Sequence, residues 1–593
     1  MASATVILLV VGVGATTALY PFGEFTAVGR CALSVVLGYA VMAGAAFSLA
    51  AVHQLAASKF IIVLAIISLA LWFTSFWRHR SRGPLRSLVG RTNSDMWPLL
   101  AGAAVIAAIA LVRLTLSPLQ NLGTSTSFRY WADGLEMASA GRVPTVTLQW
   151  GSLFAPTVSK VMLNSFDAGM SFLLGSQPLP AMGALTWISA TGLSLSLWWL
   201  SIELGLFRTA PLLILLLSAN TFLGNHEFTS DLKYFRAETF GRMVAFSALA
   251  LAIRALRNRR GYTDAVIAGA LLGIALATHL VPSAVALGMF AWYGAYVAIR
   301  KGPMATAAAR FGVTVVTALG IAASIFLLAG GGLAFGGASG GGSYQPVGGA
   351  DPTALFTTGA ALPLASSAGH WYEAPRTLLD GYVTDSLGRS VGNPYLILAA
   401  LVATGIIVIW RCPTKLKPAA VIAVGCAVNL ILVTLAFGYL YNVYILATFG
   451  ARRLGDYAPL PILILALVLV EWMTSVPWLR PGLADAITGT VVATAAAVLL
   501  SVLAPAGPGL RASKSALDYL NWIRNNTPCS ARILSNRRTG GTYEALTGRA
   551  SVTEGMGPHL RPQMLDQIVK LLQRTRTFFQ RPGQQRDLLR REG

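Results

Sequence analysis

The stretch Phe60–Arg86, FIIVLAIISLALWFTSFWRHRSRGPLR, decides the fold of this chain. Its first part, Phe60–Trp77, is an uninterrupted apolar run of the length at which an α-helix crosses a lipid bilayer. Its second part is rich in arginine, and short connections that carry Lys and Arg stay on the cytoplasmic side of a membrane. We therefore expect a span that ends in a cytoplasmic loop, and this loop fixes by parity the side on which every later loop lies.

The rest of the chain has the composition of a membrane protein. Of its 593 residues, 55% are hydrophobic and only 11% are charged, and the mean hydropathy is +0.63. Soluble domains carry about 25% charged residues. Apolar runs of roughly 20 residues recur along the chain, whereas the short alternating strands of a membrane β-barrel do not. The sequence therefore predicts an all-α polytopic membrane protein.

The net charge and the cysteines exclude other classes of protein. A net charge of +22 also occurs in proteins that bind nucleic acid. Here the cations cluster in short connections between apolar runs, as the positive-inside rule requires, so we expect no nucleic-acid partner. The four cysteines, Cys31, Cys412, Cys426 and Cys529, include no CxxC pair. The sequence thus predicts neither a disulfide framework nor a zinc site.

About fourteen spans account for the apolar runs and place both termini outside the cytoplasm. The predicted spans are Ala4–Tyr20, Ala32–Ala51, Phe60–Trp77, Trp97–Leu114, Met182–Leu204, Pro211–Leu223, Phe240–Leu256, Ala265–Leu280, Val281–Ile299, Phe311–Ala329, Pro394–Trp410, Pro418–Tyr439, Ala458–Met473 and Leu483–Leu503. In this topology every large basic cluster falls on the cytoplasmic side.

The spans divide the chain into three parts. Residues 1–95 hold the first helices and the basic cytoplasmic loop, residues 96–504 form a transmembrane core, and residues 505–593 form an extracytoplasmic tail. The core has outer loops at residues 115–181, 224–239, 330–393 and 440–457. The tail combines predicted helices and strands, at Ser513–Asn525, Ala531–Leu534, Ala550–Thr553 and Leu565–Phe579. We expect a small α/β domain there, and an incomplete one, because the chain stops after a helix and its Gly cap.

The first outer loop holds the strongest candidates for chemistry. In Tyr130–Pro144, YWADGLEMASAGRVP, the acids Asp133 and Glu136 are three residues apart, which places both on one face of a helix. We predict that helix over Ser127–Ser139, ending at Gly141. A carboxylate at the membrane surface can act as a general base on a sugar or lipid hydroxyl. The alternative is that both acids are solvated side chains of a loop.

A second helix is predicted in the same loop, at Val158–Leu174. Its apolar residues follow one face, and Lys160, Asn164 and Asp167 interrupt the apolar pattern. We therefore expect this helix to lie in the membrane interface and not to span the bilayer.

Polar residues of the later outer segments could face the same site. The candidates for substrate binding are Glu227, Asp231, Lys233, Arg236, His279, Arg452 and Arg453. The acids among them could position an acceptor, bind a metal or pair with neighbouring cations. Arginine suits phosphate because its guanidinium donates two parallel hydrogen bonds, although arginines at this depth also anchor spans at the interface. His279 is either a packed histidine or a substrate ligand.

Three parts of the sequence resemble one enzyme family. The pattern Asp133-x-x-Glu136-x-Ala138-x-x-Gly141-x-x-Pro144 in a long outer loop looks like the GT-C superfamily of polyprenyl-phosphate-sugar glycosyltransferases. The segment Ala268–His279 is similar to a Gly-x-x-x-Gly-x-Ala-x-x-x-His span of that superfamily, although its small residues also suit close helix packing. Leu546–Arg549 and its neighbours in the tail resemble the outer domain of actinobacterial members. The resemblance covers roughly residues 96–593 and leaves the first three spans unexplained.

The resemblance implies an integral membrane glycosyltransferase of the cell envelope that works on the extracytoplasmic face. The donor would be a polyprenyl-phosphate-linked sugar, the acceptor a glycan or lipid, and Asp133 the general base. Cationic side chains would hold the leaving phosphate, and a divalent cation, Mg²⁺ or Mn²⁺, is an open alternative for that role. Two other functions stay open: a transporter or flippase of lipid-linked glycans, and a non-catalytic relative of the family. The sequence identifies neither the sugar nor the acceptor, the linkage or the oligomeric state.

Overall fold

The computed structural model describes the greater part of the membrane bundle and pieces of the tail. The described residues are 2–20, 24–80, 125–143, 160–175, 178–207, 209–210, 236–257, 261–300, 304–329, 394–440, 457, 459–474, 514–528, 531–533, 546–547 and 549–551. Three of the predicted spans, at residues 97–114, 211–223 and 483–503, and the predicted outer loop at residues 330–393 lie outside the described residues.

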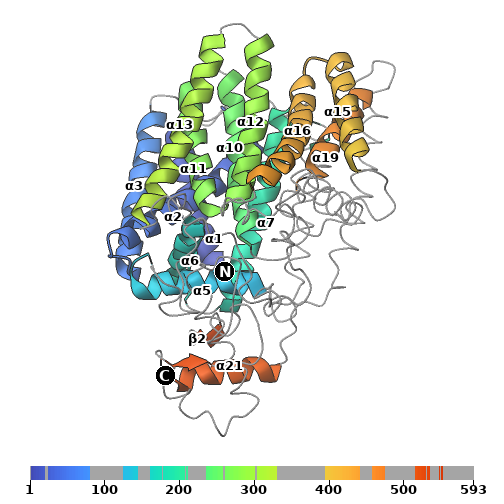
Figure 1. Ribbon diagram of the computed structural model, residues 1–593. Helices are drawn as coiled ribbons and strands as arrows, with labels where there is room; N and C mark the ends of the chain where they lie inside the picture. The colour runs from blue at the N-terminus through green and yellow to red at the C-terminus, as the bar shows by residue number, and fades with distance from the viewer. Residues whose placement is uncertain are drawn as a thin grey trace, which may run out of the picture.

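The described chain is built from long apolar helices that stand side by side (Figure 1). They are α1 (Ala2–Leu19), α2 (Ala27–Ala51), α3 (Ala57–Arg80), α7 (Pro178–Glu203), α10 (Ala237–Arg257), α11 (Gly261–Thr278), α12 (Leu280–Arg300), α13 (Met304–Leu328), α15 (Pro394–Arg411), α16 (Lys417–Leu440) and α19 (Pro459–Thr474). Each predicted span that falls on described residues coincides with one of these helices, so the prediction of a polytopic helical membrane protein is confirmed there.

Seven of the described helices are long and apolar enough to cross a membrane on their own, namely those within α2, α3, α7, α10, α11, α12 and α13. The larger number of about fourteen spans stays a prediction. The seven helices differ in how much of their surface other parts of the protein cover. The α10 segment is 94% buried, whereas α3 is only 17% and α13 only 22% buried. α10 therefore lies at the centre of the bundle, and α3 and α13 present their apolar side chains to the surroundings.

Small residues let the central helices approach closely. On α11, Gly269 and Gly273 lie against α13, where a Cβ atom at Gly269 would be 2.5 Å from the Thr314 carbonyl oxygen. A Cβ at Gly273 would be 2.7 Å from the Ala318 carbonyl oxygen. Helices in membranes associate through such close backbone contacts because lipid provides no hydrophobic drive. The Gly-x-x-x-Gly pattern of the sequence therefore has a packing role in this chain.

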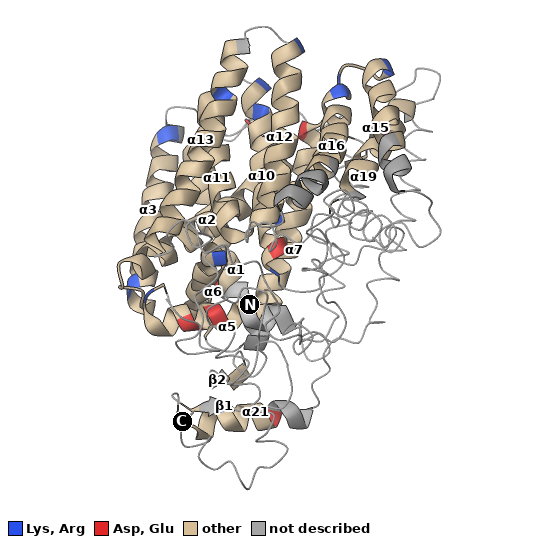
Figure 2. Ribbon diagram, viewed as in Figure 1, with Lys and Arg blue, Asp and Glu red and all other residues tan. Residues whose placement is uncertain are grey.

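One end of the bundle is basic. Figure 2 shows Lys and Arg at the upper ends of the helices, opposite the end where the acids of α5 (Ser125–Ala140) lie. The helices alternate in direction, so that α10 ends and α11 begins at the basic end. This is the arrangement that the positive-inside rule predicts for a bundle whose basic end faces the cytoplasm.

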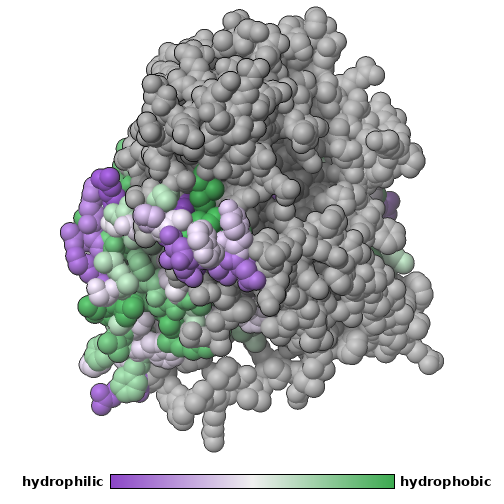
Figure 3. All heavy atoms as spheres, turned by 90° about the horizontal axis from the view of Figure 1, so that it is seen from below, coloured by the Kyte–Doolittle hydropathy of each residue, from purple (hydrophilic) through white to green (hydrophobic). Residues whose placement is uncertain are grey.

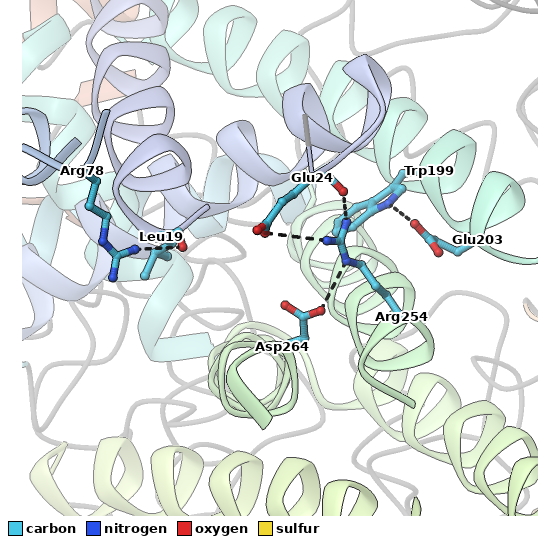
Figure 4. Close-up of polar contacts among 7 residues, drawn as sticks. All are labelled: Leu19, Glu24, Arg78, Trp199, Glu203, Arg254 and Asp264. Atoms are coloured by element: carbon cyan, nitrogen blue, oxygen red, sulfur yellow. Dashed lines mark hydrogen bonds and ion pairs between the residues drawn. The ribbon is translucent and has the colours of Figure 1, made fainter. Parts of the chain in front are cut away.

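A half-buried arginine, Arg254, ties the first two helices to this basic end (Figure 4). The Arg254 guanidinium donates to the Glu24 carbonyl oxygen at 2.5 Å and lies 3.3 Å from Asp264 Oδ2. Its Cζ atom lies 3.8 Å from the centre of the Phe25 ring. Because Glu24 and Phe25 connect α1 to α2, this network attaches the N-terminal helices to α10 and α11.

Two helices, α5 and α6, form the described part of the predicted first outer loop. α5 lies across the lower end of the bundle, and α6 (Val161–Leu174) packs against both α5 and α2 (Figure 1). The predicted helix at Ser127–Ser139 is confirmed, and Gly141 follows it with a φ of +66°. A glycine accepts this left-handed conformation without strain, so the chain turns sharply there.

The described part of the tail is small. It consists of α21 (Lys514–Asn526) and two short strands, β1 (Arg532–Ile533) and β2 (Ala550–Ser551), which pair in parallel with Arg532 opposite Ala550. Arg549 is 7% exposed and donates to the carbonyl oxygens of Arg524 and Thr527, at 2.7 and 2.6 Å. It thereby joins the end of α21 to the start of β2. The predicted helix at residues 565–579 lies outside the described residues.

The close contact of α11 with α13 predicts that Gly269→Ala destabilises the protein. The added methyl group would displace the α13 backbone, and overpacking of this kind costs about 1–3 kcal/mol. Gly320→Ala on α13 is the matched control, because a Cβ there would meet no atom within 4 Å. The melting temperature in detergent should fall for Gly269→Ala and not for Gly320→Ala. Equal melting temperatures would contradict the packing.

The two ends of the bundle predict opposite labelling in intact cells. Ala140 at the end of α5 and Arg300 at the end of α12 are both exposed and lie at opposite ends. Single cysteines at these positions, in a variant without the four native cysteines, should differ in reaction with a membrane-impermeant maleimide. We expect Ala140→Cys to react from outside and Arg300→Cys to react only after the membrane is opened. Labelling of both from one side would overturn the topology.

Candidate active site

Both acids that the sequence singled out are buried on α5. Asp133 is 8% and Glu136 is 9% exposed, and their neighbours Tyr130 and Trp131 are almost fully enclosed. The interpretation of these acids as solvated loop side chains is therefore wrong. A carboxylate that is removed from water costs free energy unless other groups compensate for it, so buried acids often mark functional sites.

α6 holds α5 in place through a close crossing. A Cβ atom at Gly134 would lie only 2.5 Å from Cβ of Asp167, so only glycine fits at this point of α5. On one side of the crossing, Lys160 Nζ donates to the Tyr130 hydroxyl at 3.0 Å. Gly134 directly follows Asp133 in the chain, and the crossing therefore brings Asp167 of α6 beside the turn of α5 that carries Asp133.

α6 is enclosed by other helices, and its expected position in the membrane interface stays a prediction. Every residue from Val161 to Ser171 is buried, because α2 and α5 pack on this helix. Asp167 is 0% exposed, and neither of its carboxylate oxygens has a hydrogen-bond partner among the described residues. Sequence reasoning noted Asp167 as an interruption of an apolar face and missed its place at the site.

The electrostatic environment favours the neutral form of Asp167. α6 has 14 residues, fewer than a membrane-spanning helix needs, and the sequence predicts that this segment does not span the bilayer. Burial raises the pKa of the Asp167 carboxyl well above its ordinary range, and the negative charge of Asp133 raises it further. The two acids thus interact electrostatically across the contact between α5 and α6.

An aromatic cluster includes Phe166, the residue that precedes Asp167 on α6. The rings of Tyr39 on α2, Phe166 on α6 and Phe240 on α10 lie within 4.9–5.4 Å of one another, centre to centre. The Tyr39 hydroxyl shares a hydrogen bond of 2.8 Å with the Thr278 hydroxyl at the end of α11. Four helices therefore meet here, and Phe166 and Phe240 connect Asp167 with a second group of charged residues.

That second group is centred on Glu238 and His279. Glu238 Oε1 lies 3.2 Å from His279 Nε2, and both residues are buried. Gly241 makes the approach possible, because a Cβ there would lie 2.7 Å from Cβ of His279. The structure therefore places His279, a predicted substrate ligand, where α10 begins and α11 ends, in contact with the Glu238 carboxylate.

Sequence reasoning missed Arg242, one helical turn after Glu238. Arg242 is 1% exposed, its Nε donates to the Tyr457 hydroxyl at 3.1 Å, and its Cζ lies 4.8 Å from the Tyr457 ring centre. Arg242 falls inside the predicted span Phe240–Leu256, where cations were expected only at the cytoplasmic end. The signal that could have found it is its spacing from Glu238, because residues four apart share one face of a helix.

The other predicted site residues fall into two groups. Arg236 is half-buried and directly precedes α10, so it lies near Glu238 in the chain. The remaining candidates lie outside the described residues, namely Glu227, Asp231, Lys233, Arg452 and Arg453. Among the described residues, no group of three or more His, Cys, Asp or Glu side chains could hold a metal ion. The divalent cation considered from the sequence stays a prediction.

Figure 3 shows the surface at this end of the molecule, where hydrophilic and hydrophobic side chains of the described residues lie side by side. Such a mixed surface is typical of a protein face at the boundary between lipid and water.

Comparison with solved structures finds chains with a similar fold, whereas comparison by sequence finds none. No protein-family model matches the chain, and no curated protein matches it. The chain is similar to ArnT. The structure concerned is ArnT from Cupriavidus metallidurans bound to undecaprenyl phosphate, with a TM-score of 0.42 and 14% sequence identity over 82% of this chain and 89% of that chain. At this similarity, the function of this chain has to be argued from its own side chains.

The buried Asp167 predicts a pH-dependent stability. Its pKa is raised in the folded state, so its stabilising contribution is complete below the unfolded pKa and is lost as the pH rises toward the folded pKa. The loss is at most about 1.4 kcal/mol per pH unit. Between about pH 4 and pH 8, we expect the melting temperature of the wild type to fall more than that of Asp167→Asn, whose amide does not titrate.

The matched control for this measurement is Asp518→Asn, which changes an exposed carboxylate on α21. This control should follow the wild-type pH dependence. Parallel curves for the wild type and Asp167→Asn would show that Asp167 does not hold a proton in the folded state.

Proposed function

We propose that this chain is an integral membrane glycosyltransferase that transfers a sugar from a polyprenyl-phosphate donor to a glycan or lipid acceptor of the cell envelope. The observation that supports this best is the buried pair Asp133 and Asp167 on two helices that lie at one end of an apolar bundle. At that end a lipid-borne donor presents its head group, and a buried carboxylate is a stronger base than a solvated one.

In this proposal Asp133 is the general base. It takes the proton from the acceptor hydroxyl, and the oxygen attacks the anomeric carbon of the donor sugar. The bond from that carbon to the phosphate oxygen breaks, its electron pair leaves with polyprenyl phosphate, and the configuration inverts. Glu136, one turn further along α5, is the candidate for holding another hydroxyl of the acceptor.

The leaving phosphate needs positive charge. Lys160 at the start of α6 and Arg242 on α10 are the buried cations that the described residues bring to this end. Charge-assisted hydrogen bonds from such groups are among the strong ones in proteins. Both side chains contact a tyrosine, Tyr130 and Tyr457 respectively, and these contacts limit their freedom to move. Lys233, Arg452 and Arg453 are predicted to add to this positive charge.

The chemistry of the described spans favours an enzyme over a transporter. Transporters place charged residues near the membrane midplane, on broken helices. In the described spans α10 and α11, the charged residues instead gather near the helix ends: Glu238, Arg242, Arg254 and Arg257 on α10 and Asp264 on α11. The expected working side is the extracytoplasmic one, because the acid pair lies opposite the basic end of the bundle.

The proposal predicts that Asp133→Asn abolishes sugar transfer. Loss of a general base typically costs about 10²–10⁴-fold in rate. We expect such a loss in membranes supplied with a panel of labelled polyprenyl-phosphate sugars and cell-envelope acceptor, whereas Asp133→Glu should keep part of the activity. Glu136→Gln should have a smaller effect than Asp133→Asn.

Asp518→Asn serves here as the matched control, and expression and melting temperature show whether each variant folds. Full transfer by a folded Asp133→Asn variant would refute the assignment of the base. Movement of the lipid-linked sugar across vesicle membranes without any transfer by the wild type would favour the flippase alternative.

A further inference from the structure

Asp167 has an environment that a lone carboxylate does not tolerate. It is completely enclosed, and neither oxygen accepts a hydrogen bond from the described residues. An isolated ionised carboxylate in such surroundings costs far more free energy than folding can supply, so the group takes up a proton instead. A structural aspartate would be satisfied by a helix N-terminus, an arginine or backbone N–H groups, and Asp167 has none of these among the described residues.

The position of Asp167 relative to α5 adds a second, independent observation. Its Cβ would lie 2.5 Å from a Cβ at Gly134, the residue that follows Asp133. The absence of a side chain at Gly134 is what lets α6 bring Asp167 to this turn of α5. A larger residue would force the helices apart and would separate the two acids.

We propose that Asp133 and Asp167 hold one proton between them, on Asp167, and work as an electrostatically coupled carboxyl pair with a single negative charge. This deepens the function proposed above, and it rests on that function only for the role of Asp133 as the base. In the pair, Asp167 is a positioning residue: it holds the proton and leaves the charge on Asp133. Two carboxyls that share a site titrate as a unit, with one ionisation moved to high pH.

Among the described residues, few charged groups lie on the elements that pack around Asp167. α2 contributes only the uncharged Tyr39, and in their described residues α1 and α7 bring no charged side chain to this end. α3 brings only the exposed Lys59, which donates to Gln54. At this end of the bundle, the buried charged or titratable side chains other than tyrosine that the described elements around α6 contribute are Glu136 on α5, Lys160 before α6, Glu238 and Arg242 on α10, and His279 after α11. Asp167 forms an ion pair with none of them, and Asp133 is the one charged group that acts on it appreciably.

The single charge has a consequence for the proposed transfer. The donor carries a negative phosphate, and a doubly ionised pair would repel it. With one proton in the pair, Asp133 still accepts the proton of the acceptor hydroxyl, which makes the pair neutral as negative charge develops on the leaving phosphate. Ionisation of Asp167 at high pH would therefore lower the rate, although Asp133 stays available as a base.

The first test needs no enzyme activity. Infrared spectra of the purified protein in detergent report the carbonyl stretch of a neutral carboxylic acid. Between wild type and Asp167→Asn at neutral pH, we expect the difference spectrum to show loss of one such band, and Asp518→Asn should leave it in place. No difference between wild type and Asp167→Asn would overturn the proposal.

Asp133→Asn distinguishes an electrostatically coupled pair from simple burial. Without the charge of Asp133, the remaining Asp167 should lose its proton at lower pH, so the infrared band should disappear at a lower pH than in the wild type. The same midpoint in both proteins would mean that burial alone holds the proton, and the pair would be refuted. Because this measurement uses no substrate, its outcome is separate from the success or failure of the glycosyltransferase proposal.

The second test uses transfer as its readout. If the donor panel gives activity, the wild-type rate should decline at alkaline pH, and in Asp167→Asn this decline should move to higher pH or disappear. A purely structural role for Asp167 would lower the rate equally at every pH. An unchanged shape of the pH–rate profile in a folded Asp167→Asn variant would refute the positioning role.

Discussion

The crossing of α5 over α6 at Gly134 is the contact on which the candidate site depends. It brings a fully enclosed carboxyl beside the turn that carries Asp133, and no residue larger than glycine could stand there. The crossing is itself held by the contact of α6 with α2 and by the ring cluster of Tyr39, Phe166 and Phe240. The packed helices of the bundle leave few alternative positions for a short helix between them. The crossing of α5 and α6 is therefore rigid.

Much of the helical framework could be predicted from the sequence, because apolar length and basic connections depend on composition alone. The boundaries of α5 also followed from local signals, since Gly141 ends the helix. The site was predicted only in part. Asp133 was singled out as a candidate from its neighbours in the chain, but the meeting of Asp167 with α5 depends on how two helices cross, which no periodicity encodes.

Glu238 and His279 show the same limit at longer range. They are 41 positions apart in the printed sequence, and the pair exists because α10 and α11 run in opposite directions and Gly241 admits the imidazole. Arg242 was missed for a different reason. A cation within an apolar run is usually assigned to the nearest membrane boundary, and only the tertiary position of Tyr457 reveals what it contacts.

The bond between Tyr39 and Thr278 has a consequence for how this protein is made. The two residues are 239 positions apart, so α2 enters the membrane long before its partner exists. At about 5–20 residues per second, synthesis of the intervening chain takes roughly 12–48 s. During that time the Tyr39 hydroxyl can form hydrogen bonds only with lipid head groups, water or an insertion factor. The Glu24 carbonyl oxygen likewise has no hydrogen bond from Arg254 until α10 has been made. The N-terminal helices therefore complete these contacts only after α10 and α11 have been made, although they are the first to be synthesised.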